Sequence, residues 1–143
     1  MQVRHILLDK GREIIAINAD ATLSEAASLL ARRRIGAVIV LGEDGMLAGI
    51  LSERDVVRAI SAESVAALAR PVSGFMTREI TTCSEDDTVD GLMELMTNGR
   101  FRHVPVVTNG RLVGIVSIGD VVKRRIEDVE REAEEIKQYI ATA

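Results

Sequence analysis

The chain has 143 residues, a net charge of −4 at pH 7 and a pI near 5.3. This length is enough for a hydrophobic core, and an apolar content of 47% predicts a folded protein. The acidic balance and an aromatic content of 2% argue against a nucleic-acid binder, which usually has a basic surface and stacking side chains.

Other compositional features exclude further classes of protein. The longest apolar run, "IGAVIVLG" (35–42), is far shorter than a membrane span. The single cysteine, Cys83, rules out an internal disulfide and a multi-cysteine metal site within one chain. The sequence contains no arrangement typical of a catalytic triad, and no Gly-x-Gly-x-x-Gly or Gly-Lys-Ser/Thr loop. We therefore expect a cytoplasmic protein that is not an enzyme and has no nucleic-acid or membrane partner.

The predicted elements of the first half begin with a short β-prone piece at 14–18. Thr22 is a predicted helix N-cap, and Glu25 completes a capping box with it. The helix that follows has apolar residues at helical spacing. A buried strand (37–41), a turn rich in glycine and acidic residues, and a second strand (46–51) then predict a hairpin, followed by a second helix.

The second half repeats this order after a connecting segment at 61–76. A β-prone piece (79–83) precedes Thr88, a second predicted N-cap, and a helix. Strands at 103–107 and 111–116 then form a second predicted hairpin before the last helix. The order β-α-β-β-α therefore occurs twice, and it predicts an α+β fold.

The two halves also align with each other residue by residue. Residues 13–41 match residues 79–107 with a shift of 66 positions, and the shift becomes 65 after the hairpin turn. Agreement over roughly 50 residues indicates a duplication. One three-stranded unit with two helices leaves part of its sheet uncovered, so two copies are expected to pack together with pseudo-twofold symmetry.

Each half ends on the frame Gly-aliphatic-aliphatic-Ser-x-x-Asp, as "GILSERDVV" (49–57) and "GIVSIGDVV" (114–122). Two tandem copies of the order β-α-β-β-α, each closed by this frame, resemble the CBS domain pair, also called the Bateman module. The resemblance covers about residues 3–125, and the chain is similar to small bacterial proteins that consist of one such pair. It implies one module over 1–143, with CBS repeats at 8–62 and 72–127 and a C-terminal helix extension at 128–143.

The resemblance also implies a ligand. CBS pairs typically bind adenosine-containing molecules such as AMP, ADP, ATP, NAD or S-adenosylmethionine in two clefts between the repeats. In the family, the aspartate of the frame accepts hydrogen bonds from the ribose hydroxyls, and the serine contacts phosphate or ribose. The residue types suit this, because a carboxylate accepts from both hydroxyls and a helix N-terminus favours a phosphate. No catalytic cofactor is implied.

Transferred to this sequence, the family pattern predicts two unequal sites. One combines Ser117 and Asp120 with Ile14, Ile15, Ala37 and Val38. The other combines Ser52 and Asp55 with Ile80, Thr81, His103 and Val104, and has Arg54, Thr77 and Arg102 nearby. Because Gly119 replaces Arg54 and Gly36 replaces Arg102, we expect the Asp55 site to bind the more phosphorylated ligand. A plain N-cap role for each Ser-x-x-Asp, a solvated Arg54 and a core role for His103 stay open as alternatives.

The last helix continues well past the second frame and carries a 4-3-4-3-4 apolar stripe. The stripe consists of Val122, Ile126, Val129, Ala133, Ile136 and Ile140. It is expected to pack on its own module or on a partner chain. We predict a homodimer, with this helix at the interface or displayed for a regulated protein not yet identified. The competing interpretation is an adaptor with vestigial clefts that acts through its acidic C-terminal helix.

Overall fold

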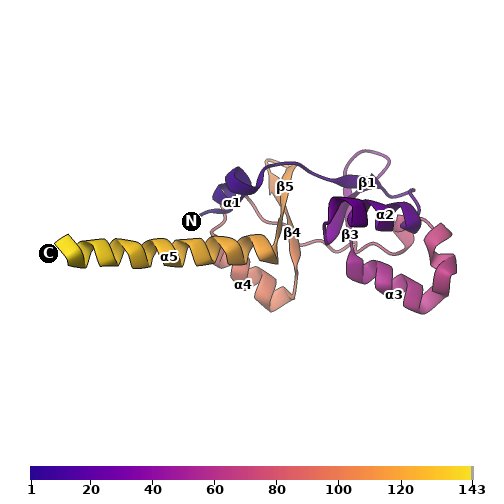
Figure 1. Cartoon of the computed structure of the whole chain (residues 1–143). Helices are drawn as coiled ribbons and strands as arrows, with labels where there is room; N and C mark the ends of the chain where they lie inside the picture. Colours follow the sequence, from indigo (N-terminus) through magenta and orange to yellow (C-terminus); the bar gives the residue numbers. More distant parts are fainter. Residues whose placement is uncertain (143) are drawn as a thin grey trace. The chain divides into compact units, whose positions relative to one another are not determined.

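The computed structural model describes residues 1–142 and divides the chain into two compact units (Figure 1). The first unit is Glu13–Thr81, and the second joins Met1–Arg12 to the chain from Thr82 onward. Each unit combines helices with a small sheet, which confirms the predicted α+β class.

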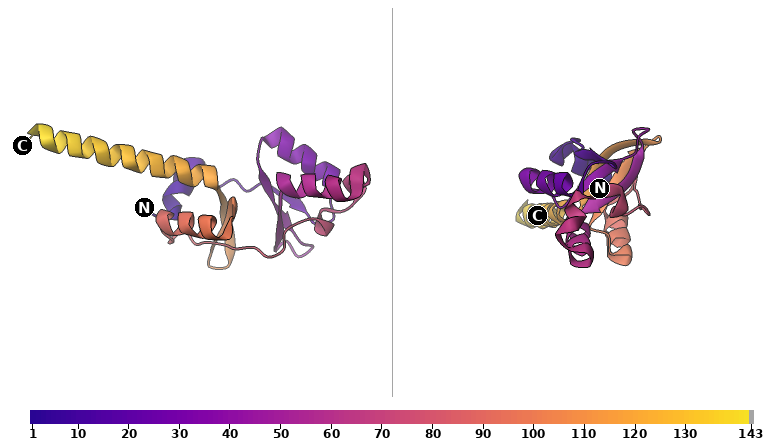
Figure 2. Two further views of the ribbon diagram at one scale, coloured as in Figure 1. Left: turned by 90° about the horizontal axis from the view of Figure 1, so that it is seen from below. Right: turned by 90° about the vertical axis from the view of Figure 1, so that its right-hand side faces the viewer.

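The unit Glu13–Thr81 contains a three-stranded sheet in the order β1-β2-β3, with β1 parallel and β3 antiparallel to β2. Its elements are β1 (Ala16–Asn18), α2 (Leu23–Arg33), β2 (Ala37–Leu41), β3 (Leu47–Ser52), α3 (Glu53–Glu63) and the 3-10 turns η1 (Ser64–Ala69) and η2 (Val72–Gly74). Helices α2 and α3 lie beside each other, as the purple and magenta helices in Figure 2 show.

Local chemistry sets the start of α2 as the sequence predicts. The amide of Glu25 donates to Thr22 Oγ1 (3.1 Å), and the amide of Thr22 donates to Glu25 Oε2 (3.2 Å). The predicted capping box is therefore confirmed. Leu23 and Leu30 of this helix pack in one hydrophobic cluster with Val38 of β2.

The other unit is built around the antiparallel hairpin of β4 and β5. Its elements are α1 (Val3–Lys10), α4 (Val89–Gly99), β4 (His103–Thr108), β5 (Arg111–Ser117) and α5 (Ile118–Thr142). Asn109 and Gly110 at the hairpin turn both have positive φ (52° and 77°), the conformation that suits a tight two-residue turn. The predicted N-cap Thr88 is also confirmed, because its hydroxyl accepts from the amide of Gly91 at 3.0 Å.

The strand predicted at 79–83 is wrong, since this segment contributes only an isolated parallel bridge between Cys83 and Val106. The physical reason lies in β4. At the matching position of the first unit, the amide of Ile39 donates to Ile15 O (3.2 Å) and extends the pairing of β1 with β2. Pro105 occupies that position in β4 and has no N–H to donate, so the ladder stops at Cys83.

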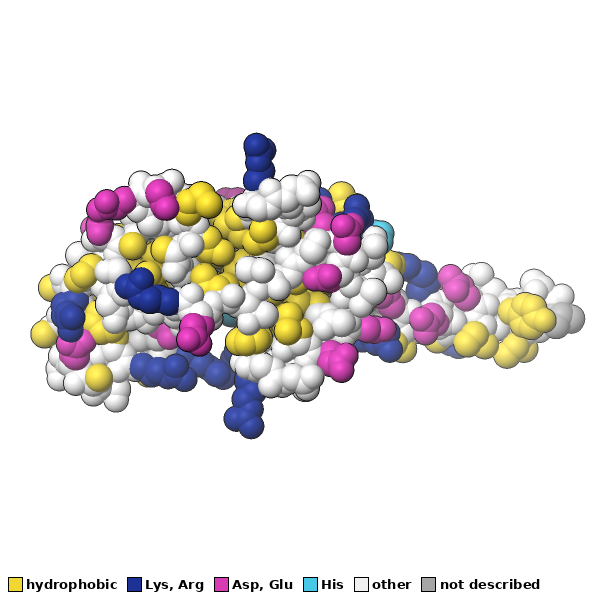
Figure 3. All heavy atoms as spheres, turned by 180° about the vertical axis from the view of Figure 1, so that it is seen from behind, with side chains coloured by type: hydrophobic (Ala, Val, Ile, Leu, Met, Phe, Trp, Pro, Cys, Tyr) yellow, Lys and Arg dark blue, Asp and Glu magenta, His cyan; other side chains and the backbone are white. Residues whose placement is uncertain are grey.

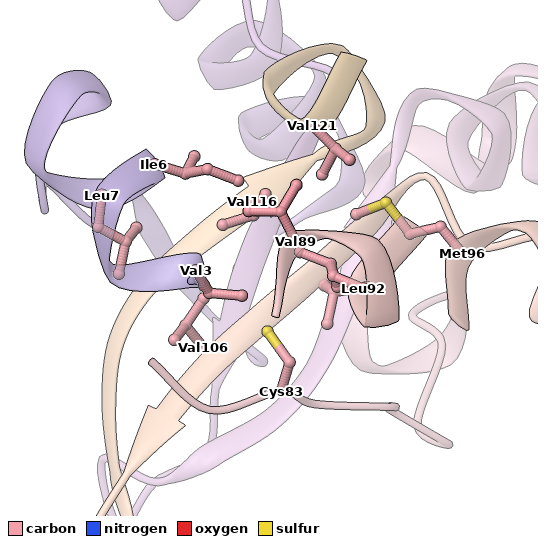
Figure 4. Close-up of a cluster of buried hydrophobic side chains, with 11 residues drawn as sticks. Val3, Ile6, Leu7, Cys83, Val89, Leu92, Met96, Val106, Val116 and Val121 are labelled. Carbon is pink, nitrogen blue, oxygen red and sulfur yellow. The ribbon is translucent and has the colours of Figure 1, made fainter. Parts of the chain in front are cut away.

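Helix α1 was not predicted, and it packs in the core of the second unit. Val3, Ile6 and Leu7 are buried there, and their side chains converge with those from α4, β4, β5 and α5 (Figure 4). The amide of Val3 donates to Asp87 O at 2.8 Å, which ties the helix to the turn before α4. A short segment with mixed polarity, outside the aligned repeats, has no pattern that predicts this position.

Helix α5 is the longest element, and it continues past α1 and α4 of its own unit (Figure 1). Val121, in its first turn, is its only buried residue among those the structure describes. The apolar stripe from Val122 to Ile140 is exposed, so the alternative that it packs on its own module is wrong. No helix within residues 1–142 is both long and apolar enough to cross a membrane.

Candidate functional site

Each unit holds one Ser-x-x-Asp box at a junction between strand and helix. In the first unit, Ser52 ends β3 and caps α3, and the amide of Asp55 donates to Ser52 Oγ (3.2 Å). The Asp55 carboxylate accepts at Oδ2 from Ser52 N (2.9 Å) and Ser52 Oγ (3.1 Å). Both of these hydrogen bonds use Oδ2, so Oδ1 of Asp55 takes no part in the cap. Asp55 is 9% exposed and is the only buried charged residue in the described part of the chain.

The box of the second unit has the same geometry. The amide of Ser117 donates to Asp120 Oδ2 (2.8 Å), and the amide of Asp120 donates to Ser117 Oγ (3.1 Å). The N-cap interpretation is therefore correct for both boxes. It does not exclude ligand binding, because the cap holds the carboxylate in a fixed position at the start of the helix.

The second box has an additional partner that sequence reasoning missed. Lys10 Nζ, at the end of α1, lies 2.6 Å from Asp120 Oδ2 and donates to Ile115 O at 2.7 Å. Burial alone would raise the pKa of Asp120, but the hydrogen bonds from Lys10 and Ser117 outweigh it and lower that pKa below its ordinary value. Within residues 13–81, no lysine or arginine forms an ion pair with Asp55.

Lys10 and Asp120 also line a cavity of about 460 Å³ within the second unit. The other lining residues are Ile6, Asp9, Lys123, Arg124 and Glu127. Arg124 is held there by an ion pair with Asp9 (2.8 Å). The comparison of the repeats placed the basic side chains beside Asp55, but the structure adds three cations around Asp120.

The hydrogen-bond register places other predicted residues next to the box of their own unit. Ala37 is the partner of Ser52 in the sheet, and His103 is the partner of Ser117. The amide of Ile118 donates to Arg102 O at 2.8 Å, so Arg102 also lies at the start of α5. The predicted combinations that join Ala37 to Ser117 and His103 to Ser52 stay predictions.

The pleat of the strands separates the predicted residues by face. Val38 and Val104 point into the hydrophobic cores of their units, so only their backbones are available to a ligand. Ala37 and His103 lie on the opposite faces of β2 and β4. His103 is half-buried and already has an interaction partner.

The remaining predicted residues lie in the unit Glu13–Thr81. Thr77 pairs with Ile50 of β3 through reciprocal backbone hydrogen bonds (2.8 and 3.0 Å), near the Ser52 box. Arg54 is exposed on the first turn of α3. Ile14, Ile15, Ile80 and Thr81 are half-buried.

Other chemistry within the described chain is sparse. No group of three His, Cys, Asp or Glu side chains in residues 1–142 is placed to hold a metal ion. Cys83 is buried in the core, as predicted, and burial, with a smaller contribution from Asp87, raises the pKa of its thiol to about 12. The thiol is therefore protonated at neutral pH and is a poor nucleophile.

Two sequence-related units, each with a Ser-x-x-Asp box at a helix start, make this chain a tandem-repeat protein. The model of the CBS domain family matches residues 3–62 and 72–127. The chain therefore belongs to the CBS domain family, as its resemblance predicted.

Individual relatives agree with this assignment. An Acidianus ambivalens protein, named as an uncharacterized 17.7 kDa protein, is 33% identical over 131 residues, which cover 87% of this chain and 77% of that protein. The matched region spans only 61% and 25% of two CBS domain-containing proteins from Arabidopsis thaliana.

Solved structures share the fold. The CBS-domain containing protein ATU1752 from Agrobacterium tumefaciens has a TM-score of 0.84 and 48% identity, over 87% of this chain and 92% of that chain. The CBS domain pair of protein MJ0100, solved in complex with 5-methylthioadenosine and S-adenosyl-L-methionine, has a TM-score of 0.79 and 27% identity, over 90% and 98% of the two chains.

Proposed function

We propose that this chain is a regulatory module that binds an adenosine-containing ligand and catalyses no reaction itself. The observation that carries the proposal is the pair of ordered carboxylates, Asp55 and Asp120, each held at a helix start by the serine three residues before it. The complex of the MJ0100 CBS pair with two adenosine derivatives supports the choice of ligand class.

The chemistry of the boxes suits the parts of such a ligand. A ribose diol offers two hydroxyl donors, and an ionised carboxylate accepts both. A phosphate would be stabilised by the positive end of the helix dipole at the start of α3 or α5. Lys10, Lys123 and Arg124 line the cavity beside Asp120 as groups that can pair with a phosphate, although the carboxylates of Asp9, Asp120 and Glu127 balance their charge. AMP, ADP, ATP and NAD all meet this description.

Ligand binding would act on the module through its stability. A ligand that binds only the folded form stabilises it by about 2.7 kcal/mol at a concentration about a hundred times its Kd. We propose that the module works in the cytoplasm as a homodimer and transmits this change to a separate regulated protein. A closed twofold dimer is the commonest assembly of soluble proteins, which supports the dimer.

The test is a thermal-shift panel of AMP, ADP, ATP, NAD, NADH and S-adenosylmethionine on the full chain, followed by calorimetric titration of each compound that binds. GTP serves as the control for non-specific binding of polyphosphate. At least one adenosine compound should raise the melting temperature. A panel without any shift would refute the ligand proposal, and nucleotide turnover detected by chromatography would refute the non-catalytic role.

Two matched variants test which of the two boxes binds the more phosphorylated ligand. Asp55→Asn and Asp120→Asn keep an acceptor for the cap but lose the negative charge, while Asp44→Asn in the β2–β3 turn provides a control outside both boxes. If the Asp55 site binds the more phosphorylated ligand, as the sequence predicts, Asp55→Asn should weaken ATP binding more than Asp120→Asn. A larger loss in Asp120→Asn would instead assign ATP to the box that contacts Lys10.

A further inference from the structure

The exposed apolar stripe of α5 is the largest feature that ligand binding leaves unexplained. Ile126, Ile136 and Ile140 are 52%, 59% and 68% exposed, and Val122 and Val129 are exposed as well. Figure 3 shows hydrophobic side chains at the surface along the part of α5 that extends beyond its unit. Exposed aliphatic side chains aligned on one helix face indicate a surface that a partner covers.

The stripe has the spacing of a coiled-coil seam. Written as heptads, Ile126, Ala133 and Ile140 occupy a positions, and Val122, Val129 and Ile136 occupy d positions. The side of α5 that faces its own unit is a different one, because Val121, Arg124 and Asp128 are the buried or nearly buried side chains of this helix. The seam is therefore available while the helix stays attached to its unit.

The charges that flank the seam identify the partner and its direction. In a parallel pair of α5 helices, each g position faces the e position of the next heptad on the other helix. Arg125 would then face Glu130 of the second copy, and Glu132 would face Lys137 of the second copy. Both contacts pair opposite charges, and twofold symmetry forms each of them twice.

An antiparallel pair with the same apolar overlap would bring like charges together. Matching Val122 with Ile140 of the other helix places Lys123 opposite Lys137, and it places Glu130 and Glu132 each opposite its own copy. These contacts are repulsive. The charge pattern thus discriminates between the two directions, although the apolar stripe alone does not.

We propose that α5 binds the α5 helix of a second copy of this chain, as a parallel two-stranded coiled coil over 122–140. Arg125 already forms an exposed ion pair with Asp90 (3.3 Å). Such a pair contributes little at the surface, and the five donors of arginine allow a second carboxylate. The proposal names the interface of the homodimer proposed above, and it is independent of the ligand proposal, since none of the seam residues belongs to either Ser-x-x-Asp box.

Mass measurement by light scattering on the full chain is the first test. At micromolar concentration we expect twice the chain mass of 15.5 kDa. The double variant Ile136→Glu and Ile140→Glu should return the mass to that of one chain while far-UV circular dichroism shows that the units remain folded, since both side chains are exposed. Glu134→Lys, at a b position outside the seam and its e and g flanks, is the control and should leave the dimer intact.

Three results of this experiment would overturn the proposal. A wild-type monomer would mean that the seam does not bind a second copy. A stripe variant that remains dimeric would assign the dimer to another surface. A trimer or tetramer, toward which β-branched d positions shift the preference, would contradict the two-stranded assembly.

Charge-swap variants and a disulfide cross-link test whether the two α5 helices are parallel. Glu132→Lys should raise the dimer dissociation constant about tenfold, because it replaces two attractive contacts by two repulsive ones, and adding Lys137→Glu should restore it. Ile140→Cys should form a disulfide-linked homodimer under oxidation, since the two a positions meet in a parallel pair. Efficient cross-linking of Val122→Cys to Ile140→Cys in a mixture, with no Ile140→Cys homodimer, would show an antiparallel pair and refute the proposal.

Discussion

Lys10 and Asp120 form an ion pair that joins the end of the first helix to the start of the last one, with Nζ 2.6 Å from Oδ2. The same carboxylate oxygen accepts from the amide of Ser117. One oxygen therefore serves both the cap of α5 and the contact with α1. Any ligand that binds Asp120 through its ribose would meet this ammonium group, which could then neutralise a neighbouring phosphate.

The first prediction concerns the effect of Lys10 on ligand choice. Lys10→Met keeps most of the aliphatic stem but removes the charge, so it should weaken ATP binding about tenfold while leaving adenosine binding nearly unchanged. Calorimetric titration of both ligands measures the difference. Arg111→Met, an exposed cation of the same unit, is the control for net charge. Equal losses for ATP and adenosine would show that Lys10 does not contact phosphate.

The second prediction concerns the pH dependence of stability. The pKa of Asp120 is lowered in the folded chain, so its ionised form stabilises the fold above the ordinary carboxyl pKa. That stabilisation should disappear as the pH falls from the ordinary value of 3.8 through the lowered folded-state pKa. Urea unfolding at several pH values should therefore show wild type more stable than Asp120→Asn at pH 7, with the gap closing below about pH 4. A gap that stays constant would contradict this linkage.

The third prediction concerns helix α1 as part of the second unit. Leu7 is 1% exposed and its neighbour Leu8 is 70% exposed, which provides a matched pair on one helix. Leu7→Ala should lower the free energy of unfolding by about 2–5 kcal/mol, and Leu8→Ala should change it by less than about 0.5 kcal/mol. Chemical denaturation of the two variants measures this. Similar values for both would mean that α1 does not pack in the core.

A second substitution tests the same contact from the opposite side. A Cβ added at Gly114 would lie 2.7 Å from Leu7 Cδ2, so Gly114→Ala should destabilise the unit by about 1–3 kcal/mol. Combined with Leu7→Ala, the loss should be smaller than the sum of the two single losses, because the smaller side chain leaves room for the new methyl group.

The fourth prediction concerns Cys83. Its thiol is buried and has a pKa of about 12, so it should not react with a thiol reagent at pH 8 in the folded chain. Absorbance after addition of an aromatic disulfide should show one reactive thiol per chain only in denaturant. Rapid labelling of the native protein would indicate that the core of the second unit opens readily.

The features that follow from local chemistry could be predicted from the sequence. Thr22 with Glu25, and each serine with the aspartate three residues later, specify helix starts within four residues of chain. The hairpins follow from turn residues between apolar runs. These interactions depend on near neighbours, so the sequence pattern alone was sufficient for them.

Features that depend on distant contacts could not be predicted in this way. Lys10 meets Asp120 across 110 positions, and no repeat pattern includes α1. The direction of the Val38 and Val104 side chains could not be predicted either, because the apolar runs 37–41 and 104–107 show no alternation that distinguishes the two faces of the strand. The strand predicted at 79–83 failed for a reason visible in the sequence, since Pro105 removes one donor of the neighbouring strand.

The location of α1 has a consequence for the order of folding. Residues 13–81 form one continuous unit, so its core is complete as soon as this stretch has left the ribosome. The other unit is discontinuous, because its first helix is made before that stretch and the rest after it. Val3, Ile6 and Leu7 must therefore remain without their core partners until the chain from Cys83 onward has been synthesised. The chain thus makes the first part of its second domain before the whole of the other domain, and it can complete the second domain only afterwards.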